Sequence, residues 1–238
     1  PYRADGTLAS INDGSWTGQG QNPLEWLENN PLRYKKYKMI STVFADLTLY
    51  RNLVFRSQFA VDFSHTTGFS QSFPDYEPNL GEGSAARSST DGLGLHLTNT
   101  LTYRFDKDNV HDFNFLLGHE WQDYHVEAFS VSTAGQTNSK LTDISTGTRA
   151  TSWTSTADSD YSRVSFFGRG EYNYADRYYA EVSVRTDGSS RFGKNNRWGV
   201  FGAVGFMWNL RNENFMAGTR DWLTMGQVAF SSGTSGTS

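Results

Sequence analysis

Apolar and polar residues alternate along most of this chain with a period of two. In residues 178–185 the even positions are Tyr, Ala, Val and Val, whereas the odd positions are Tyr, Glu, Ser and Arg. Successive side chains of a β-strand point to opposite faces, so this period predicts strands whose two faces meet different surroundings. One of the two faces must be buried or in contact with lipid.

The same period predicts about eight strands. They cover roughly residues 36–50, 53–63, 93–105, 111–126, 161–174, 178–185 and 197–209, and an eighth begins near residue 223. Short turns are expected at 51–52, 106–109 and 175–177, and long loops at about 64–90 and 127–160. Short connections at one end and long loops at the other are typical of outer-membrane barrels.

Three further segments carry no strand pattern. The first 30 or so residues contain Pro, Gly and Asn, and the connector 211–222 is expected to hold one helical turn around residues 214–216. The motif Asp187-Gly188-Ser189-Ser190 is interpreted as a tight outer loop, because Asp-Gly is a turn signal.

Strand length and aromatic content favour a membrane barrel over a soluble β-sandwich. Several alternating runs reach the roughly 9–11 residues that cross a bilayer, against roughly five or six for an ordinary strand. Aromatic residues make up 15% of the chain, although its mean hydropathy is −0.59, a combination that a barrel produces because only alternate residues face lipid. The aromatic residues expected beside the short turns, at one membrane interface, are Tyr50, Tyr103, Phe105, Tyr172, Tyr174, Tyr178, Tyr179 and Trp208.

Composition argues against several other classes of protein. The 21 Lys and Arg residues are scattered among 25 acidic residues, which gives no basic footprint for nucleic acid. There is no cysteine, so thiol chemistry, disulfides and Cys-ligated zinc are excluded. We find no pattern of a hydrolase, phosphate loop or zinc protease, and therefore expect no enzyme, cofactor or metal site. The chain opens Pro1-Tyr2-Arg3, with neither an initiator Met nor a charged-then-apolar leader. Either a signal peptide has been removed or the chain is an internal piece of a longer protein, and we favour the internal piece.

Charged residues at the polar strand positions are the main candidates for a functional surface. The face assignment predicts that they project into the barrel lumen, where they contact one another or a substrate. These residues are Arg56, Asp62, Arg104, Glu120, Arg169, Glu171, Glu181 and Arg185. In the long loops, Tyr76 and Trp153 are candidates for substrate contact, because exposed aromatic rings stack on sugars or grip peptides.

Several motifs resemble one family. Residues 172–178, followed by 185–193, resemble a signature hairpin of the SusC/RagA-type TonB-dependent outer-membrane transporters of Bacteroidetes. The resemblance continues through Asn22-Pro23-Leu24, residues 53–62, residues 196–199, Gly205-Phe206-Met207-Trp208, residues 213–216 with 222–223, and residues 233–236, about half of the chain.

The resemblance implies a barrel of about 22 strands closed by an N-terminal plug. It also implies TonB-dependent import of an oligosaccharide or oligopeptide across the outer membrane, with a SusD-like surface lipoprotein as partner. On this interpretation residues 1–238 are all part of one barrel domain embedded in outer-membrane lipids, and the plug and TonB box lie outside the chain. Two alternatives stay open, a self-closed eight-stranded outer-membrane barrel with a structural or adhesive role, and a secreted β-sandwich lectin.

Overall fold

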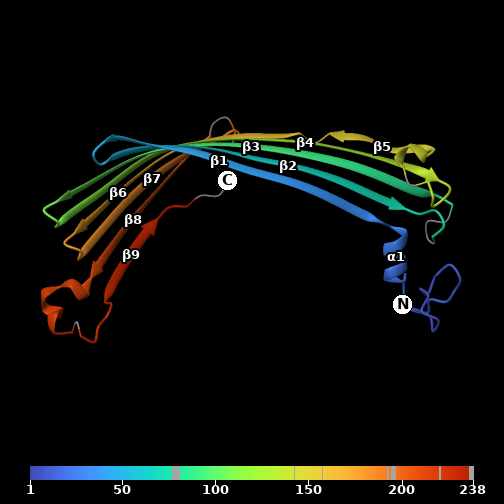
Figure 1. The fold of residues 1–238 in the computed structure, drawn as a ribbon, viewed down its shortest axis with the longest axis horizontal. Coiled ribbons are helices and arrows are strands. Elements are labelled where there is room, and N and C mark those ends of the chain that lie inside the picture. The colour runs from blue at the N-terminus through green and yellow to red at the C-terminus, as the bar shows by residue number, and fades with distance from the viewer. Residues whose placement is uncertain are drawn as a thin grey trace. The chain divides into compact units, whose positions relative to one another are not determined.

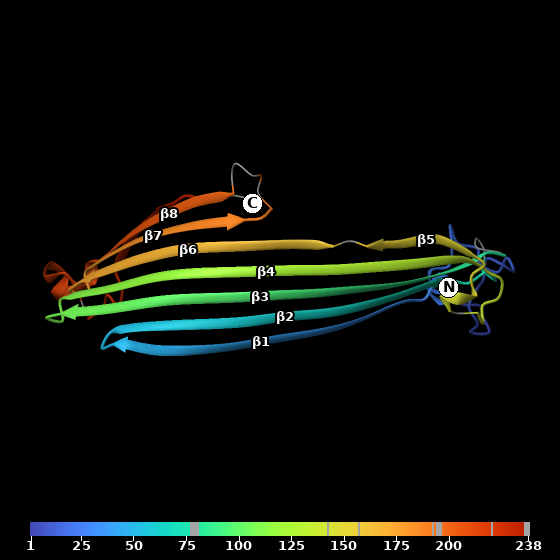
Figure 2. The same cartoon turned by 90° about the horizontal axis from the view of Figure 1, so that it is seen from above.

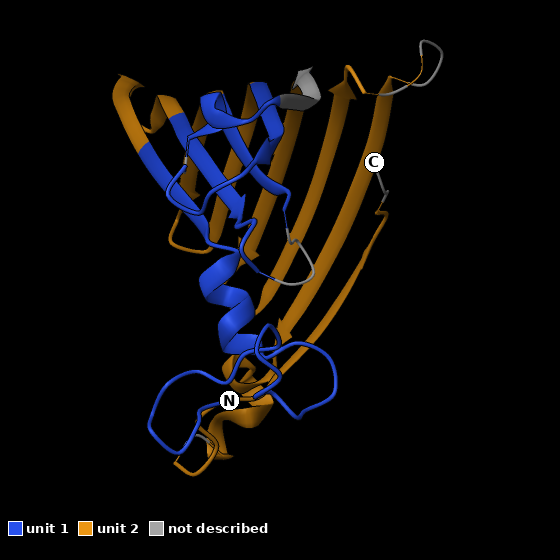
Figure 3. Cartoon of the chain, turned by 90° about the vertical axis from the view of Figure 1, so that its right-hand side faces the viewer, with its two compact units in different colours: residues 1–39, 62–93, 125–159 blue, residues 40–61, 94–124, 160–238 orange. Residues whose placement is uncertain are grey.

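The computed structural model describes residues 1–76, 81–141, 143–156, 158–191, 193, 197–219 and 221–235, and its description of side chains excludes 149–156. The chain forms two compact units, coloured separately in Figure 3. Unit 1 comprises Pro1–Met39, Asp62–Leu93 and His125–Ser159, and unit 2 comprises Ile40–Val61, Gly94–Tyr124 and Asp160–Ser238.

The chain is an all-β protein, as predicted (Figure 1). Its strands are β1 (Leu32–Tyr50), β2 (Leu53–Ser72), β3 (Gly83–Lys107), β4 (His111–Gln136), β5 (Arg149–Thr156), β6 (Ser159–Tyr174), β7 (Tyr178–Ser189), β8 (Trp198–Asn209) and β9 (Gln227–Gly233). Its helices are α1 (Pro23–Asn29) and the short 3₁₀ helices η1 (Ile144–Thr146), η2 (Leu210–Asn212) and η3 (Asn214–Thr219). Among the residues described, no helix has the length and apolar character to span a membrane.

The strands form one antiparallel sheet in the order β1-β2-β3-β4-β6-β7-β8-β9, with β5 paired to β4. Figure 2 shows β1, β2, β3, β4 and β6 side by side in this order. In the described part of the chain the order ends at β9 and does not return to β1. The sheet is therefore open, which gives no support to a self-closed eight-stranded barrel.

The register of unit 2 confirms that its sheet has two different faces. Val182 on β7 lies opposite Gly170 on β6 and Val204 on β8, whereas its neighbour Glu181 lies opposite Glu171. Residues directly opposite each other in antiparallel strands point to the same side. The apolar positions of one strand therefore line up with those of the next, and so do the charged positions.

We name the two sides of unit 2 by their residues. The apolar face comprises Val164, Phe166, Gly168, Gly170, Tyr172, Tyr174, Tyr178, Ala180, Val182, Val184, Val200, Val204, Phe206, Trp208, Val228 and Phe230. The polar face comprises Arg163, Ser165, Phe167, Arg169, Glu171, Tyr179, Glu181, Ser183, Arg185, Asp187, Phe201, Ala203, Gly205, Met207 and Ser231.

Aromatic rings gather beside the short turns of unit 2, as the sequence predicts. The ring centroids of Phe113 and Tyr172 are 4.6 Å apart, those of Tyr174 and Tyr178 are 6.2 Å apart, and those of Tyr178 and Trp208 are 6.4 Å apart. Neighbouring strands thus contribute rings to one row, the arrangement of an interfacial aromatic belt. Tyr179 lies near this end of the sheet but belongs to the polar face.

A buried carboxylate joins this aromatic row to the connector after β8. Glu213 is 8% exposed and accepts hydrogen bonds from the Tyr178 hydroxyl at 2.6 Å and the Trp208 indole N–H at 2.9 Å. The Arg177 guanidinium lies 3.8 Å from its other oxygen. The Tyr178 and Trp208 donors, and then Arg177, lower the pKa of Glu213 below its usual value of 4.5, against the opposing effect of desolvation.

Glu213→Gln should therefore destabilise the native protein at neutral pH but much less in acid. The pKa of Glu213 is lower in the folded protein than in the unfolded chain, where it is about 4.5. The ionised carboxylate therefore stabilises the folded protein fully above pH 4.5, and this stabilisation is lost as the pH falls through the lower, folded-state pKa. Urea unfolding of both proteins, followed by the fluorescence of the tryptophans at pH 7 and at pH 3, measures the difference. A difference of equal size at both pH values would contradict this role of the carboxylate.

The two long loops are much shorter than the sequence predicts. Strand β2 continues to Ser72 and β3 begins at Gly83, while β4 continues to Gln136 and β5 occupies part of the second expected loop. These extensions are rich in Ser and Thr on both faces. They show no alternation, because a strand that is polar on both sides carries no period-2 signal, yet its backbone is satisfied by its neighbours.

Two other expectations need correction. Residues 187–189 belong to β7 and are not a tight loop, because they pair with residues 163–165 of β6. The eighth predicted strand, β9, begins at Gln227 and not near residue 223. The predicted helical turn at 214–216 is confirmed and forms part of η3.

The N-terminal residues form a helix that the strand pattern does not reveal. Pro23 occupies the first turn of α1, where its missing N–H costs no hydrogen bond, and the Asn22 side chain caps the helix by accepting from Leu24 N at 3.2 Å. The Asn22 amide also donates to the carbonyl of Ala9 at 2.6 Å, and Asn22 is fully buried. In unit 1 the Asn12 amide donates to the carbonyl of Asp75 at 2.7 Å, and the buried Ala9, Asn22 and Tyr76, which is 1% exposed, make up a small core.

Candidate functional site

The polar face of unit 2 carries a cluster of charges around Arg185. Its guanidinium donates to Glu120 Oε2 at 2.7 Å and to Asp187 Oδ1 at 2.8 Å. The same guanidinium lies 5.4 Å from the centre of the Phe167 ring. The ring in turn covers Gly118, where a Cβ atom would come within 2.1 Å of it. Three strands, β4, β6 and β7, therefore hold Arg185 in one position.

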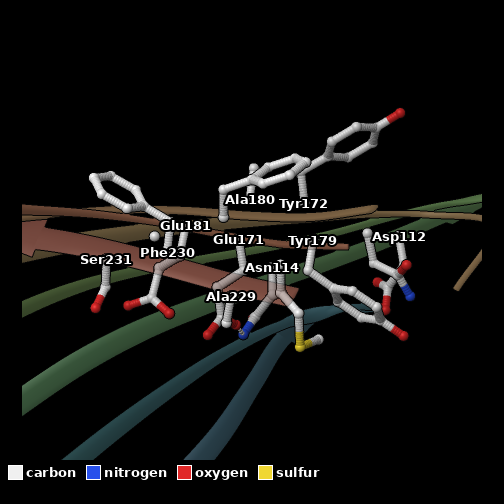
Figure 4. Close-up of a pocket in the computed structure, with 14 residues that line it drawn as sticks. Asp112, Asn114, Glu171, Tyr172, Tyr179, Ala180, Glu181, Ala229, Phe230 and Ser231 are labelled. Atoms are coloured by element: carbon white, nitrogen blue, oxygen red, sulfur yellow. Dashed lines mark hydrogen bonds between the residues drawn. The ribbon is translucent and has the colours of Figure 1, made fainter. Parts of the chain in front are cut away.

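A second feature of the polar face is a cavity of about 520 Å³ that contains three carboxylates, of Asp112, Glu171 and Glu181 (Figure 4). Glu171 accepts from the Asn114 amide at 2.5 Å and pairs with Arg169 at 3.2 Å. Like charges directly opposite each other repel. Glu181 lies directly opposite Glu171, so a cation beside Glu181 would be favourable, as Arg169 is beside Glu171.

Figure 4 shows how the sheet separates the two kinds of lining residue. Glu171, Glu181 and Tyr179 lie on one side of the ribbons, whereas Tyr172 and Ala180 lie on the other. This division agrees with the register of β6 and β7. The charged groups of this cavity therefore belong to the polar face.

A third feature is a cavity of about 540 Å³ lined by Arg56, Arg104 and Leu116, among others. Arg56 forms two hydrogen bonds with Asp46, at 2.6 and 2.7 Å, a bidentate pair. Leu116 also lines a cavity beside Phe167 and Arg185. Because Leu116 lines both cavities, Arg56 and Arg104 lie on the same face of the sheet as the Arg185 cluster.

The remaining candidates lie in unit 1. Asp62 pairs with Lys38 at 2.9 Å. The expectation that Tyr76 offers an exposed ring is wrong in this structure, because the ring packs in the small core of unit 1 and desolvation, followed by the charge of Glu25, raises the pKa of its hydroxyl. The side chain of Trp153 lies outside the described residues. Substrate contact by either residue stays a prediction.

The sequence predicts the charged residues of the polar face but not their partners. The candidates do not include the partners of Asp62, Arg56 and Arg185, which are Lys38, Asp46 and Asp187. Lys38 and Asp46 do occupy polar positions in the alternation of the first strand. Asp187 falls in an expected loop, although it lies two residues after Arg185 and so shares its face. Asp187 could have been predicted by extending the alternation of faces two residues beyond the expected end of the strand.

An open antiparallel sheet with one apolar face, one charged face and a row of aromatic rings beside its short turns defines the class of this protein, a segment of the wall of a larger β-barrel. No family model matches the chain. The TonB-dependent receptor SusC of Bacteroides thetaiotaomicron is 35% identical over 107 residues, which are 45% of this chain and 10% of SusC. The TonB-dependent receptor P26 of Formosa agariphila is 27% identical over 217 residues, 86% of this chain and 22% of P26.

Solved structures agree with the sequence relatives. The RagAB peptide transporter superposes with a TM-score of 0.85 and 28% identity, over 96% of this chain and 26% of that one. The RagAB peptide importer in its closed-closed state gives a TM-score of 0.86, also at 28% identity, over 99% of this chain and 26% of that one. The chain is thus a homologue of TonB-dependent receptors, and the resemblance to the SusC/RagA type is confirmed. It spans between a tenth and about a quarter of the length of these relatives.

Proposed function

We propose that this chain is part of the barrel wall of a TonB-dependent importer in the bacterial outer membrane, which takes up an oligopeptide or oligosaccharide with a SusD-like lipoprotein as partner. The observation that carries the proposal is the superposition of nearly the whole chain on the RagAB peptide transporter. In this role the apolar face contacts lipid and the polar face lines the lumen. All of residues 1–238 belong to the barrel domain, and other residues supply the plug and the TonB box.

The charged side chains of the polar face could bind polar groups of a plug or of a substrate. A wide barrel has a wet interior, in which paired charges such as Arg185 with Glu120 are stable. The acidic cavity at Glu171 and Glu181 is suited to a cationic side chain of the plug or of a peptide. The structural relatives are a peptide transporter and a peptide importer, so an oligopeptide is the first substrate to test.

An uptake experiment tests this function. Cells that carry the full-length protein should accumulate a labelled oligopeptide mixture, and deletion of TonB or of the neighbouring lipoprotein should reduce accumulation at least tenfold. Uptake of a labelled oligosaccharide mixture under the same conditions tests the other substrate class. Uptake that is unchanged without TonB would contradict the proposal, because the transport would then be passive.

A further inference from the structure

An exposed apolar row in unit 1 ends at an aromatic and charged boundary. Met39, Phe63 and Leu93, one residue each from β1, β2 and β3, are 56%, 38% and 38% exposed. Two residues further along, β1 and β2 carry Tyr37 and His65, whose rings stack with their centres 6.5 Å apart. On β3 the corresponding residue is Asp91, whose carboxylate pairs with the His65 ring. Positions two apart on a strand share a face, so this boundary continues the same side of the sheet as the apolar row.

The next positions on this side of the sheet form a basic cavity of about 430 Å³. Arg33 and Lys35 come from β1, Arg87 comes from β3, and all three line it. Phe69 lines it from β2, and its ring lies 5.1 Å below the guanidinium of Arg87. The remaining lining residues are Pro31, Thr67, Gly68, Gln71, Phe73 and Asp143.

Charge in this cavity is unbalanced. It contains three cationic side chains and one carboxylate, that of Asp143, which lies 3.6 Å from Arg87. Arg33 and Lys35 are exposed. A site with an excess of positive charge and two phenylalanine rings fits an anionic group that is attached to an apolar body.

We propose that this basic cavity binds the phosphate-bearing headgroup of a membrane lipid. The inference rests on the proposed function in one respect, namely that the apolar row faces lipid. The acyl chains then lie along Met39, Phe63 and Leu93, and the headgroup lies beyond the Tyr37–His65 boundary, at the level of Lys35 and Arg33. Arg87 and Arg33 present planar guanidinium groups, which recognise phosphate oxygens in a bidentate manner.

Lipid binding to the full-length protein in dodecylmaltoside micelles tests the proposal, with native mass spectrometry as the readout. Dioleoylphosphatidic acid should bind and zwitterionic dioleoylphosphatidylcholine should bind at least tenfold more weakly. One Lys or Arg near an anionic lipid contributes about 1 kcal/mol, so Lys35→Gln should weaken binding of the phosphatidic acid about fivefold, and Arg33→Gln combined with Lys35→Gln about 25-fold.

The neighbouring residue supplies a matched control. Lys36 is exposed on the same strand and points to the opposite side of the sheet. Lys36→Gln makes the same change in charge and should leave the affinity unchanged. Arg33→Lys keeps the charge but loses the planar guanidinium, so it should weaken binding, though by less than removal of the charge does. Equal losses for Lys35→Gln and Lys36→Gln would overturn the proposal, and so would equal binding of the two lipids.

Two further measurements distinguish a lipid site from a site for free phosphate, and a failure of the lipid proposal from a failure of the transport proposal. Inorganic phosphate should not compete with the phosphatidic acid at equimolar concentration, and competition with equal affinity would identify a site for free phosphate instead of a lipid. Peptide uptake by the same variants is measured in cells. Selective lipid binding without TonB-dependent uptake would overturn the proposed transport function alone, whereas normal uptake without selective lipid binding would overturn only the lipid site.

Discussion

Replacing Val182 with arginine should prevent most of the protein from inserting into membranes. Val182 lies in the middle of β7 on the apolar face, opposite Val204 and Gly170, and it is 56% exposed. An arginine that faces lipid near the midplane of a bilayer costs about 2–4 kcal/mol. Folding of the full-length protein into phosphatidylcholine vesicles, followed by heat-modifiable migration on gels, measures the loss.

A control on the other side of the sheet separates lipid exposure from general disruption. Ser231 on β9 belongs to the polar face and lies opposite Gly205, which itself lies opposite Glu181. An arginine at residue 231 has room above this glycine and can extend across it toward Glu181, which lies two strands away on β7. Ser231→Arg should therefore insert with nearly normal yield, and equal defects in the two variants would refute the assignment of the faces.

Reversing the charge of Arg185 should have the second largest effect. In Arg185→Glu three carboxylates, at residues 120, 185 and 187, would lie together on the polar face, and the contact with the Phe167 ring would be lost. The side chains of the pair Arg185 and Glu120 are 37% and 26% exposed, between a surface pair and a buried pair. We expect a loss of roughly 1–3 kcal/mol in the free energy of unfolding, measured by urea titration in lipid vesicles.

A charge swap provides the control for this variant. Adding Glu120→Arg to Arg185→Glu restores an ion pair between β4 and β7 and should recover at least half of the lost stability. The recovery should remain incomplete, since Asp187 still repels the new glutamate. If Glu120→Arg alone and the double variant were equally unstable, the two residues would not interact as the structure indicates.

The sequence predicts most strands of unit 2 and the faces of their residues, because apolar and polar residues alternate there according to the surroundings of each face. The alternation alone assigns Val182 and Glu181 to opposite faces, and the strand register confirms both assignments. The turn at residues 175–177 is confirmed as well, since β6 ends at Tyr174 and β7 begins at Tyr178. Strong alternation and a short turn are local properties, which is why they can be derived from the sequence.

Features that depend on partners far apart in the chain could not be derived in this way. The extension of β4 to Gln136 is stabilised by pairing with neighbouring strands, including β5, and leaves no periodic signal in a Ser- and Thr-rich segment. Tyr76 looks like an exposed loop aromatic, but it is 1% exposed, and the carbonyl of its neighbour Asp75 accepts a hydrogen bond from Asn12 in the distant N-terminal segment. Which charges pair across the sheet likewise depends on the strand register, which alternation does not fix.

Single-cysteine labelling along β7 in living cells would show directly which of its residues face lipid and which face the lumen, in a full-length protein from which any other cysteines have been removed; residues 1–238 contain none. Cysteines introduced one at a time at residues 179–185 of the full-length protein would be treated with a water-soluble maleimide and, separately, with a lipid-soluble one. We expect the water-soluble reagent to label the odd positions and the lipid-soluble reagent to label the even positions. Labelling without alternation, or with the two sets exchanged, would contradict a barrel wall with a lipid face and a lumen face.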